Sequence, residues 1–283
     1  MGGATLHDTM SALDAAMVST PLDVPPVLVK GGVDLGTAYV VLVALDADDR
    51  PLAAAHETAG VVRDGVVTDY VGAVDVVRRL KQQVEERLGV AVAGAHGAFP
   101  PGVASGSVRA VRHVIESAGM ECTGLVDEPS AANAVLRLAD GVVVDIGGGT
   151  TGVAVVQDGV VVHTADEPTG GTHLTLVIAG ALGVPVEEAE RLKKDPAEQP
   201  RLFPLIRPVM EKVASIVSAH TRGWPTPKVH LVGGSAAFPG FAEVVSETTG
   251  LDAVVPVAPL FVTPLGIARS APALEVGHRS AHG

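Results

Sequence analysis

The chain lacks most of the features of a secreted or membrane protein. Its 283 residues include one cysteine, Cys122, which excludes an intramolecular disulfide and a metal site built from several cysteines. We expect this thiol to be buried and inert. No apolar run reaches the roughly 20 residues that a membrane-spanning helix needs. A secretory signal begins with basic residues, but the first Lys or Arg of this chain is Lys30. These absences predict a cytoplasmic protein.

Aromatic residues and positive charge are also scarce. Aromatics make up 3% of a chain that is 47% hydrophobic, so the core must consist mainly of Val, Ala and Leu. The formal net charge of −12 argues against binding to nucleic acid or to an anionic membrane. The length suits one large domain or two modest ones.

The two ends of the chain differ from the rest. Within residues 1–28, apolar side chains recur at helical spacing and prolines follow them: Leu6, Met10, Leu13 and Met17, then Pro21, Pro25 and Pro26. This pattern predicts a short amphipathic helix on a proline-rich tether. The helix would dock either on a partner protein or on its own first domain. Residues 277–283 are polar, and we expect a disordered tail there.

Between these ends, one pattern occurs twice. An apolar strand ends in Asp, an apolar residue, Gly and Thr, and another strand follows; the copies are 32–37 and 143–150. Helical periodicity follows each copy, over 71–88 and 206–217. The repeat predicts two similar α/β domains, 29–139 with 262–276, and 140–261.

The second glycine-rich turn satisfies the dinucleotide-binding pattern G-x-G-x-x-G with Gly147, Gly149 and Gly152. That fingerprint needs a helix to begin at the turn, whereas residues 153–159 are typical of a strand and a hairpin turn. The chain also has no G-x-x-x-x-G-K-[ST] loop. We therefore reject both the Rossmann and the P-loop interpretations.

A glycine hairpin can instead bind phosphates with its backbone N–H groups. The glycines and threonines of the two hairpins that we expect to contact phosphate are Gly36, Thr37, Gly147, Gly148, Gly149, Thr150 and Thr151. Asp34 and Asp145 precede the two turns and could hold hydrated Mg²⁺ beside a phosphate chain. Either hairpin alone could be an ordinary Asp-Gly turn; the repetition in matching halves favours a phosphate site.

Three further segments complete a known set. Residues 98–102 with 125–132 resemble the first connecting motif of DnaK-type chaperones and bacterial actins, 229–235 resemble their adenosine motif, and 262–268 resemble their second connecting helix. With the two hairpins, all five motifs occur in order across residues 31–272. The resemblance implies an α/β, two-domain, ribonuclease-H-like fold of the actin and heat-shock-chaperone ATPase type, with ATP and Mg²⁺ as cofactors.

The sequence also resembles the EutJ family of ethanolamine-utilisation proteins. The segments that carry this resemblance are 61–67, 99–102, 165–171 and 260–264. It implies a chaperone-like protein in the cytoplasm or in the ethanolamine microcompartment. Its partners would be ethanolamine ammonia-lyase, which it would protect or refold, or shell proteins, whose assembly it would assist.

The same resemblance implies roles for individual residues. Glu128 would position the attacking water, and Asp145 would assist it or hold the metal. Gly170 and Gly171 would contact phosphate. The adenosine would lie beside Gly233, Gly234 and Ser235. Glu190 and Lys193 match a pair that holds adenine and ribose in bacterial actins, although a solvated charged helix face explains them equally well.

The chain departs from the superfamily in its small subdomains. Residues 88–92 link a helix directly to a strand where actins and chaperones insert a subdomain, which carries the chaperones' catalytic lysine. Residues 195–204 are too few for the usual sheet of the fourth subdomain. We therefore expect reduced small subdomains, a Mg·ATP-dependent switch and at most weak ATPase activity. The alternatives are a nucleotide-binding scaffold or filament-type assembly protein without hydrolysis, and a small-molecule kinase of the same superfamily.

Overall fold

The computed structural model describes residues 6–17, 20–63, 65–225 and 228–276. The chain divides into two compact units, 1–137 with 261–283, and 138–260. The predicted disordered tail, 277–283, lies outside the described residues. No helix in the described ranges is long and apolar enough to cross a lipid bilayer.

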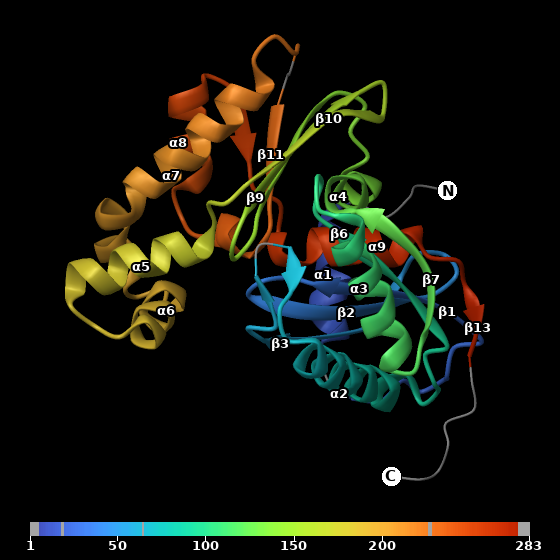
Figure 1. Cartoon of the computed structure of the whole chain (residues 1–283). Helices are drawn as coiled ribbons and strands as arrows, with labels where there is room; N and C mark the ends of the chain where they lie inside the picture. The colour runs from blue at the N-terminus through green and yellow to red at the C-terminus, as the bar shows by residue number, and fades with distance from the viewer. Residues whose placement is uncertain (1–5, 18–19, 64, 226–227, 277–283) are drawn as a thin grey trace. The chain divides into compact units, whose positions relative to one another are not determined.

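The first unit contains a mixed sheet in the order β3-β2-β1-β6-β7 (Figure 1). Strands β3, β2 and β1 are antiparallel, whereas β1, β6 and β7 are parallel. The elements are α1 (Leu6–Ala16), β1 (Leu28–Leu35), β2 (Tyr39–Leu45), β3 (Pro51–Thr58), β4 (Val62–Arg63), β5 (Val66–Val67), α2 (Tyr70–Leu88), β6 (Gly94–Phe99), α3 (Ser105–Ser117), β7 (Glu121–Asp127), α4 (Glu128–Leu136), α9 (Val262–Ser270) and β13 (Leu274–Glu275).

Helices cover both faces of this sheet. Helices α2 and α3 pack on one face, and α9 packs on the other (Figure 1). Valine, alanine and leucine dominate the core, as the composition predicts. Cys122 is 6% exposed, so its predicted burial is confirmed, and this burial raises the pKa of its thiol. Helix α1 packs against β3 with Met10 and Leu13 fully buried.

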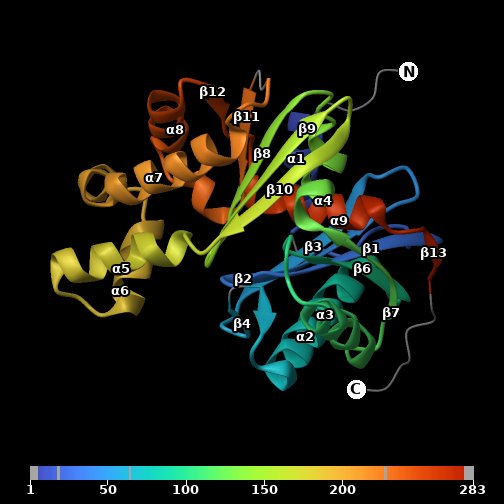
Figure 2. The same cartoon turned by 45° about the horizontal axis from the view of Figure 1, so that its top comes forward.

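The second unit repeats the same topology in the order β10-β9-β8-β11-β12. Strands β10, β9 and β8 are antiparallel, and β8, β11 and β12 are parallel. Helices α7 and α8 pack on one face of the sheet (Figure 2). The elements are β8 (Gly141–Ile146), β9 (Thr151–Gln157), β10 (Val160–Glu167), α5 (Gly171–Leu182), α6 (Val186–Lys194), α7 (Gln199–Thr221), β11 (Lys228–Val232), the short 3-10 helix η1 (Gly234–Ala237), α8 (Phe241–Thr249) and β12 (Asp252–Val254), with the 3-10 turn η2 (Pro259–Phe261) at the boundary with the first unit.

The repeated topology confirms the predicted fold of two similar α/β halves. The small subdomains are reduced as expected, because only residues 89–93 separate α2 from β6 and only 195–198 separate α6 from α7. Helix α7 continues through Pro204 and Pro208, two residues that usually interrupt a helix.

Candidate functional site

In the second unit, the glycine hairpin between β8 and β9 presents backbone donors. Gly147 closes the turn by donating its N–H to the carbonyl of Thr150 at 3.0 Å. Within the described residues, the N–H groups of Gly148, Gly149 and Thr150 donate to no backbone carbonyl. Successive N–H groups of this kind form a nest suited to an anion. The hairpin therefore fits the phosphate site that its sequence predicts.

The first residues of α5, with Gly170 before them, rest directly on this hairpin. The N–H groups of Gly171 and Thr172 donate to the carbonyl oxygens of Gly147 and Gly148 at 2.9 and 2.8 Å. A Cβ atom on Gly170 would lie 2.8 Å from the Gly147 oxygen and 2.9 Å from the Gly148 oxygen, so only glycine allows this approach. The structure thus brings together two segments predicted to contact phosphate.

The segment after β11 completes the cluster. Val232 pairs with Asp145 across parallel strands, which places residues 233–235 beside the hairpin. The hydroxyl of Ser235 donates to the Gly147 carbonyl at 2.8 Å. Gly233 has a φ of 87°, and a Cβ there would lie 2.3 Å from Asp145 Oδ1. Backbone conformation and space both require glycine at this position.

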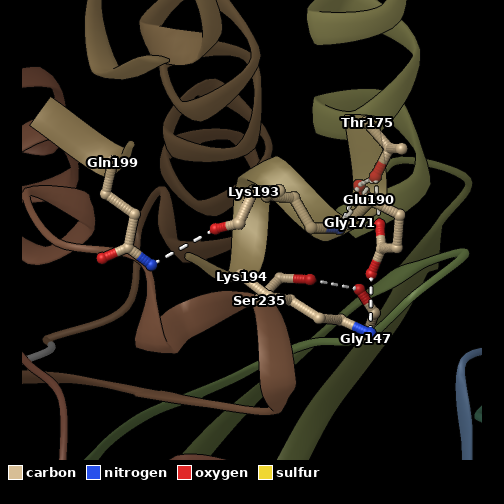
Figure 3. A network of polar contacts seen from close by, with 8 residues as sticks. All are labelled: Gly147, Gly171, Thr175, Glu190, Lys193, Lys194, Gln199 and Ser235. Carbon is tan, nitrogen blue, oxygen red and sulfur yellow. Dashed lines mark hydrogen bonds and ion pairs between the residues drawn. The ribbon is translucent and has the colours of Figure 1, made fainter. Parts of the chain in front are cut away.

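Glu190 and Lys193 extend the cluster from α6 (Figure 3). Lys193 Nζ lies 2.6 Å from Glu190 Oε2, 2.8 Å from the Thr175 hydroxyl and 3.1 Å from the Gly171 carbonyl. These contacts use all the donors of one ammonium group. Lys194 lies 3.1 Å from the other Glu190 oxygen. The pair is therefore not a solvated charged face: it ties α6 to the first turns of α5, which rest on the hairpin.

Burial and charge pairing set the ionisation of this pair. The Lys193 side chain is 13% exposed and that of Glu190 is 33% exposed. Burial raises the pKa of Glu190, but attraction to Lys193 and hydrogen bonds from Lys193, Thr175 and Lys194 lower it more, so it lies below its ordinary value. Burial lowers the pKa of Lys193, and Glu190 offsets part of this effect.

Thr151 was predicted to contact phosphate, but its hydroxyl hydrogen-bonds within the protein. Its side chain is fully buried, and its hydroxyl donates to the Thr169 carbonyl at 2.6 Å. The hydroxyl therefore holds the loop before α5 in place, and we assign Thr151 to the loop architecture instead of to a ligand. Sequence reasoning also missed Thr175, whose contacts with Glu190 and Lys193 depend on how α5 packs against α6.

In the first unit, the predicted residues lie at one edge of the sheet. Asp34 is near the carboxyl end of β1, and Glu128 is the first residue of α4, directly after β7. Strands β1, β6 and β7 are parallel, so their carboxyl ends share an edge. At adjacent-strand spacing, β1 and β7 lie roughly 10 Å apart. Asp127 caps α4 by accepting from the Ser130 N–H at 2.9 Å, which fixes where Glu128 emerges.

The hairpin between β1 and β2, like the one between β8 and β9, presents backbone N–H donors. Within the described residues, the N–H groups of Gly36, Thr37 and Ala38 donate to no backbone carbonyl. The described part of the chain contains no group of three or more His, Cys, Asp and Glu side chains that could hold a metal ion. A metal here would need ligand oxygens from a bound molecule, which suits Mg²⁺ with a nucleotide phosphate chain.

Comparison with known proteins identifies the family. Ethanolamine utilization protein EutJ of Escherichia coli (strain K12) is 43% identical over 240 residues, which cover 84% of this chain and 84% of that protein. The chain belongs to the EutJ family. A crystal structure of EutJ from Carboxydothermus hydrogenoformans is 47% identical, with a TM-score of 0.88 over 93% of this chain and 97% of that one.

More distant similarities place the EutJ fold among the actin-like ATPases. Residues 142–270 match the profile of cell division protein FtsA, and residues 56–185 match that of the MreB/Mbl proteins. The structure of MreB 5 of Spiroplasma citri bound to AMPPNP is 17% identical, with a TM-score of 0.66 over 83% of this chain and 93% of that one. This likeness supports the fold alone. This EutJ-family chain therefore has the two-domain actin-like ATPase fold.

Proposed function

We propose that this ethanolamine utilisation protein binds Mg·ATP, with the glycine hairpin of its second unit as a phosphate site. The observation that carries the proposal is the row of donors at Gly148, Gly149 and Thr150, beside residues 170–171 and 233–235, where Gly170 and Gly233 leave no room for a Cβ. MreB 5 of Spiroplasma citri, which shares the fold, has been crystallised with AMPPNP and with ADP.

The residues of this chain divide the work of holding a nucleotide. In the second unit, the N–H groups of the hairpin would bind phosphate oxygens, and Asp145 would hold the hydrated Mg²⁺ that neutralises phosphate charge. The family resemblance gives the hairpin of the first unit and Asp34 the corresponding roles. Glu128, fixed at the start of α4, would orient a water molecule. Lys193 donates to Gly171 and Thr175 at the start of α5 and to Glu190, so it would position the start of α5 instead of contacting the ligand.

We further propose that bound nucleotide alters the affinity of the chain for a client. By family resemblance, the client is ethanolamine ammonia-lyase or a microcompartment shell protein, and the role is that of a chaperone. The coupling requires only that the client bind the nucleotide-loaded and nucleotide-free states with different affinities.

A second candidate function is a nucleotide-binding scaffold that does not hydrolyse ATP. The short link between α2 and β6 favours it, because related chaperones carry their catalytic lysine in a subdomain at this place. Phosphate release, measured with and without ethanolamine ammonia-lyase, separates the two functions. Turnover above a protein-free blank that Glu128→Ala reduces supports the ATPase. ATP binding without turnover establishes the scaffold.

A further inference from the structure

Helix α5 has an outer face without charge. Residues 171–182 contain no Asp, Glu, Lys or Arg. The face nevertheless meets solvent: Leu176 is 51% exposed, and Gly180 and Ala181 are exposed as well. The outer face of a surface helix is normally charged or polar, and a helix that is apolar all round is normally covered. The composition of α5 therefore indicates that its outer face is a contact surface.

A groove runs between this face and α7. Its cavity volume is about 490 Å³, and its apolar lining consists of Leu176 and Val177 from α5 with Pro208 and Val209 from α7. The remaining lining is polar: Thr169, His173 and Lys212. Two helices that leave an apolar channel between them offer the shape in which a third, amphipathic helix packs.

The prolines of α7 are independent evidence for a contact. Pro204 and Pro208 lie inside the helix, four residues apart, and both are exposed. Each removes a helical hydrogen bond, which destabilises the helix. A charged, helix-favouring residue would be more stable at either exposed position. Such a local departure is expected where a surface serves a function, and Pro208 forms part of the groove.

The charge of the groove indicates its occupant. Among the described residues that line it there is no carboxylate, although the chain carries a net charge of −12. Among the described residues, Lys212 has no ion-pair partner, and His173 lies on the α5 side of the same groove. We propose that the groove between α5 and α7 binds an acidic amphipathic helix of a partner protein. Its apolar side chains would lie on Leu176 and Val209, and a carboxylate would face Lys212.

The groove shares a loop with the phosphate hairpin. The Thr169 carbonyl accepts from Thr151, and the Gly170 N–H donates to His173 Nδ1 at 3.2 Å. Gly171 follows directly and donates to Gly147 of the hairpin. A helix seated against Thr169 and His173 therefore contacts the loop that supports the hairpin. An effect of ATP on partner affinity follows, and this part rests on the proposed nucleotide site.

Fluorescence anisotropy with a labelled synthetic peptide tests the groove. The probe is an amphipathic helix of about 14 residues, four turns, with Leu on one face and Glu elsewhere. A matched peptide carries Lys in place of every Glu. The protein variants are Leu176→Glu and Lys212→Glu. Val162→Glu is the control, because Val162 is 43% exposed on β10 and lines no part of the groove.

We expect the acidic peptide to bind the wild type and the Val162→Glu control saturably, and to bind the two groove variants about tenfold more weakly or worse. The basic peptide should not saturate. Equal binding to all the proteins, or no saturable binding of the acidic peptide, overturns the proposal. A wild-type dimer in sedimentation that Leu176→Glu dissociates would overturn it too, since the occupant would then be a second copy.

The effect of ATP on peptide affinity is measured in a separate experiment. If ATP changes peptide affinity in the wild type, the shared loop couples the two sites. If ATP binds without changing peptide affinity, the groove stands and the coupling is refuted. If ATP does not bind, the proposed function fails, while the peptide measurements without nucleotide still decide the groove.

Discussion

The Glu190–Lys193 pair allows a quantitative test of how the site is held together. Replacing Lys193 with Met keeps the apolar stem and removes the ammonium group, leaving a half-buried carboxylate and the Gly171 carbonyl without that donor. Breaking a fully buried pair costs about 3–5 kcal/mol, and an exposed pair contributes about 0–1 kcal/mol. At 13% and 33% side-chain exposure the pair lies between these limits. We expect Lys193→Met to cost about 2 kcal/mol of unfolding free energy.

A double-mutant cycle isolates the interaction from the other effects of each substitution. The cycle combines Lys193→Met with Glu190→Gln in urea unfolding, followed by the fluorescence of Trp224, the single tryptophan of the chain, which lies in the second unit. We expect a coupling energy of about 1–2 kcal/mol. The matched control is Glu188 with Arg191, which has the same spacing on the same helix but is 40% and 61% exposed. Its coupling should lie within experimental error.

The pH dependence follows from the direction of the Glu190 shift. Its pKa in the folded chain lies below the unfolded value of about 4.3. Between the two values the unfolded chain binds more protons, so the contribution is complete above about pH 4.3 and is lost as the pH falls through the folded pKa. Glu190→Gln should flatten this part of the stability profile. The reasoning would be refuted if the coupling energy of Glu190 with Lys193 were no larger than that of Glu188 with Arg191. It would also be refuted if Glu190→Gln left the dependence of stability on acid pH unchanged.

Three further predictions follow from the structure. Gly233→Ala should weaken ATP binding and destabilise the second unit more than Gly250→Ala does. Both glycines have positive φ, but only at Gly233 do neighbouring atoms occupy the space of a Cβ. Calorimetry and urea unfolding measure the two variants, and equal effects would contradict the prediction. Glu128→Ala should keep the affinity for ATP and slow phosphate release about tenfold or more, because a group that positions water acts mainly in the transition state. Unchanged turnover in this variant would exclude Glu128 as the water-positioning residue. Residues 1–28 fused to a fluorescent protein should give diffuse fluorescence in cells that make microcompartments, because Met10 is buried in its own unit; compartment foci would show that this segment is a targeting signal.

Local chemistry made much of this molecule predictable. The glycine turns between β1 and β2 and between β8 and β9 could be read from the sequence, because Asp-x-Gly turns with flanking apolar strands depend on neighbours in the chain. The repeated strand order followed from the repeated pattern. The length of α2 was also predictable, since its apolar residues recur at helical spacing up to Leu88.

What the sequence could not show depends on contacts between distant segments. The hydroxyl of Thr151 is directed to Thr169 by the packing of β9 against the loop before α5. The stacking of His163 on His220 and Trp224 joins β10 to residues at and beyond the end of α7, and no spacing in the chain indicates it. In the same way, the difference between a solvated Lys193 and one that closes a network lies in the position of Thr175 on another helix.

Isothermal titration calorimetry of ATP with Mg²⁺ tests the central claim most directly. The wild-type chain should bind one ATP per chain saturably, and chelation of Mg²⁺ should weaken the binding. Asp145→Ala should lose the Mg²⁺-dependent part of the binding while still unfolding in one cooperative urea transition, since its carboxylate would hold the metal. No saturable heat with the wild type, or equal affinity in the variant, would contradict the assignment of the second hairpin as a Mg·ATP site.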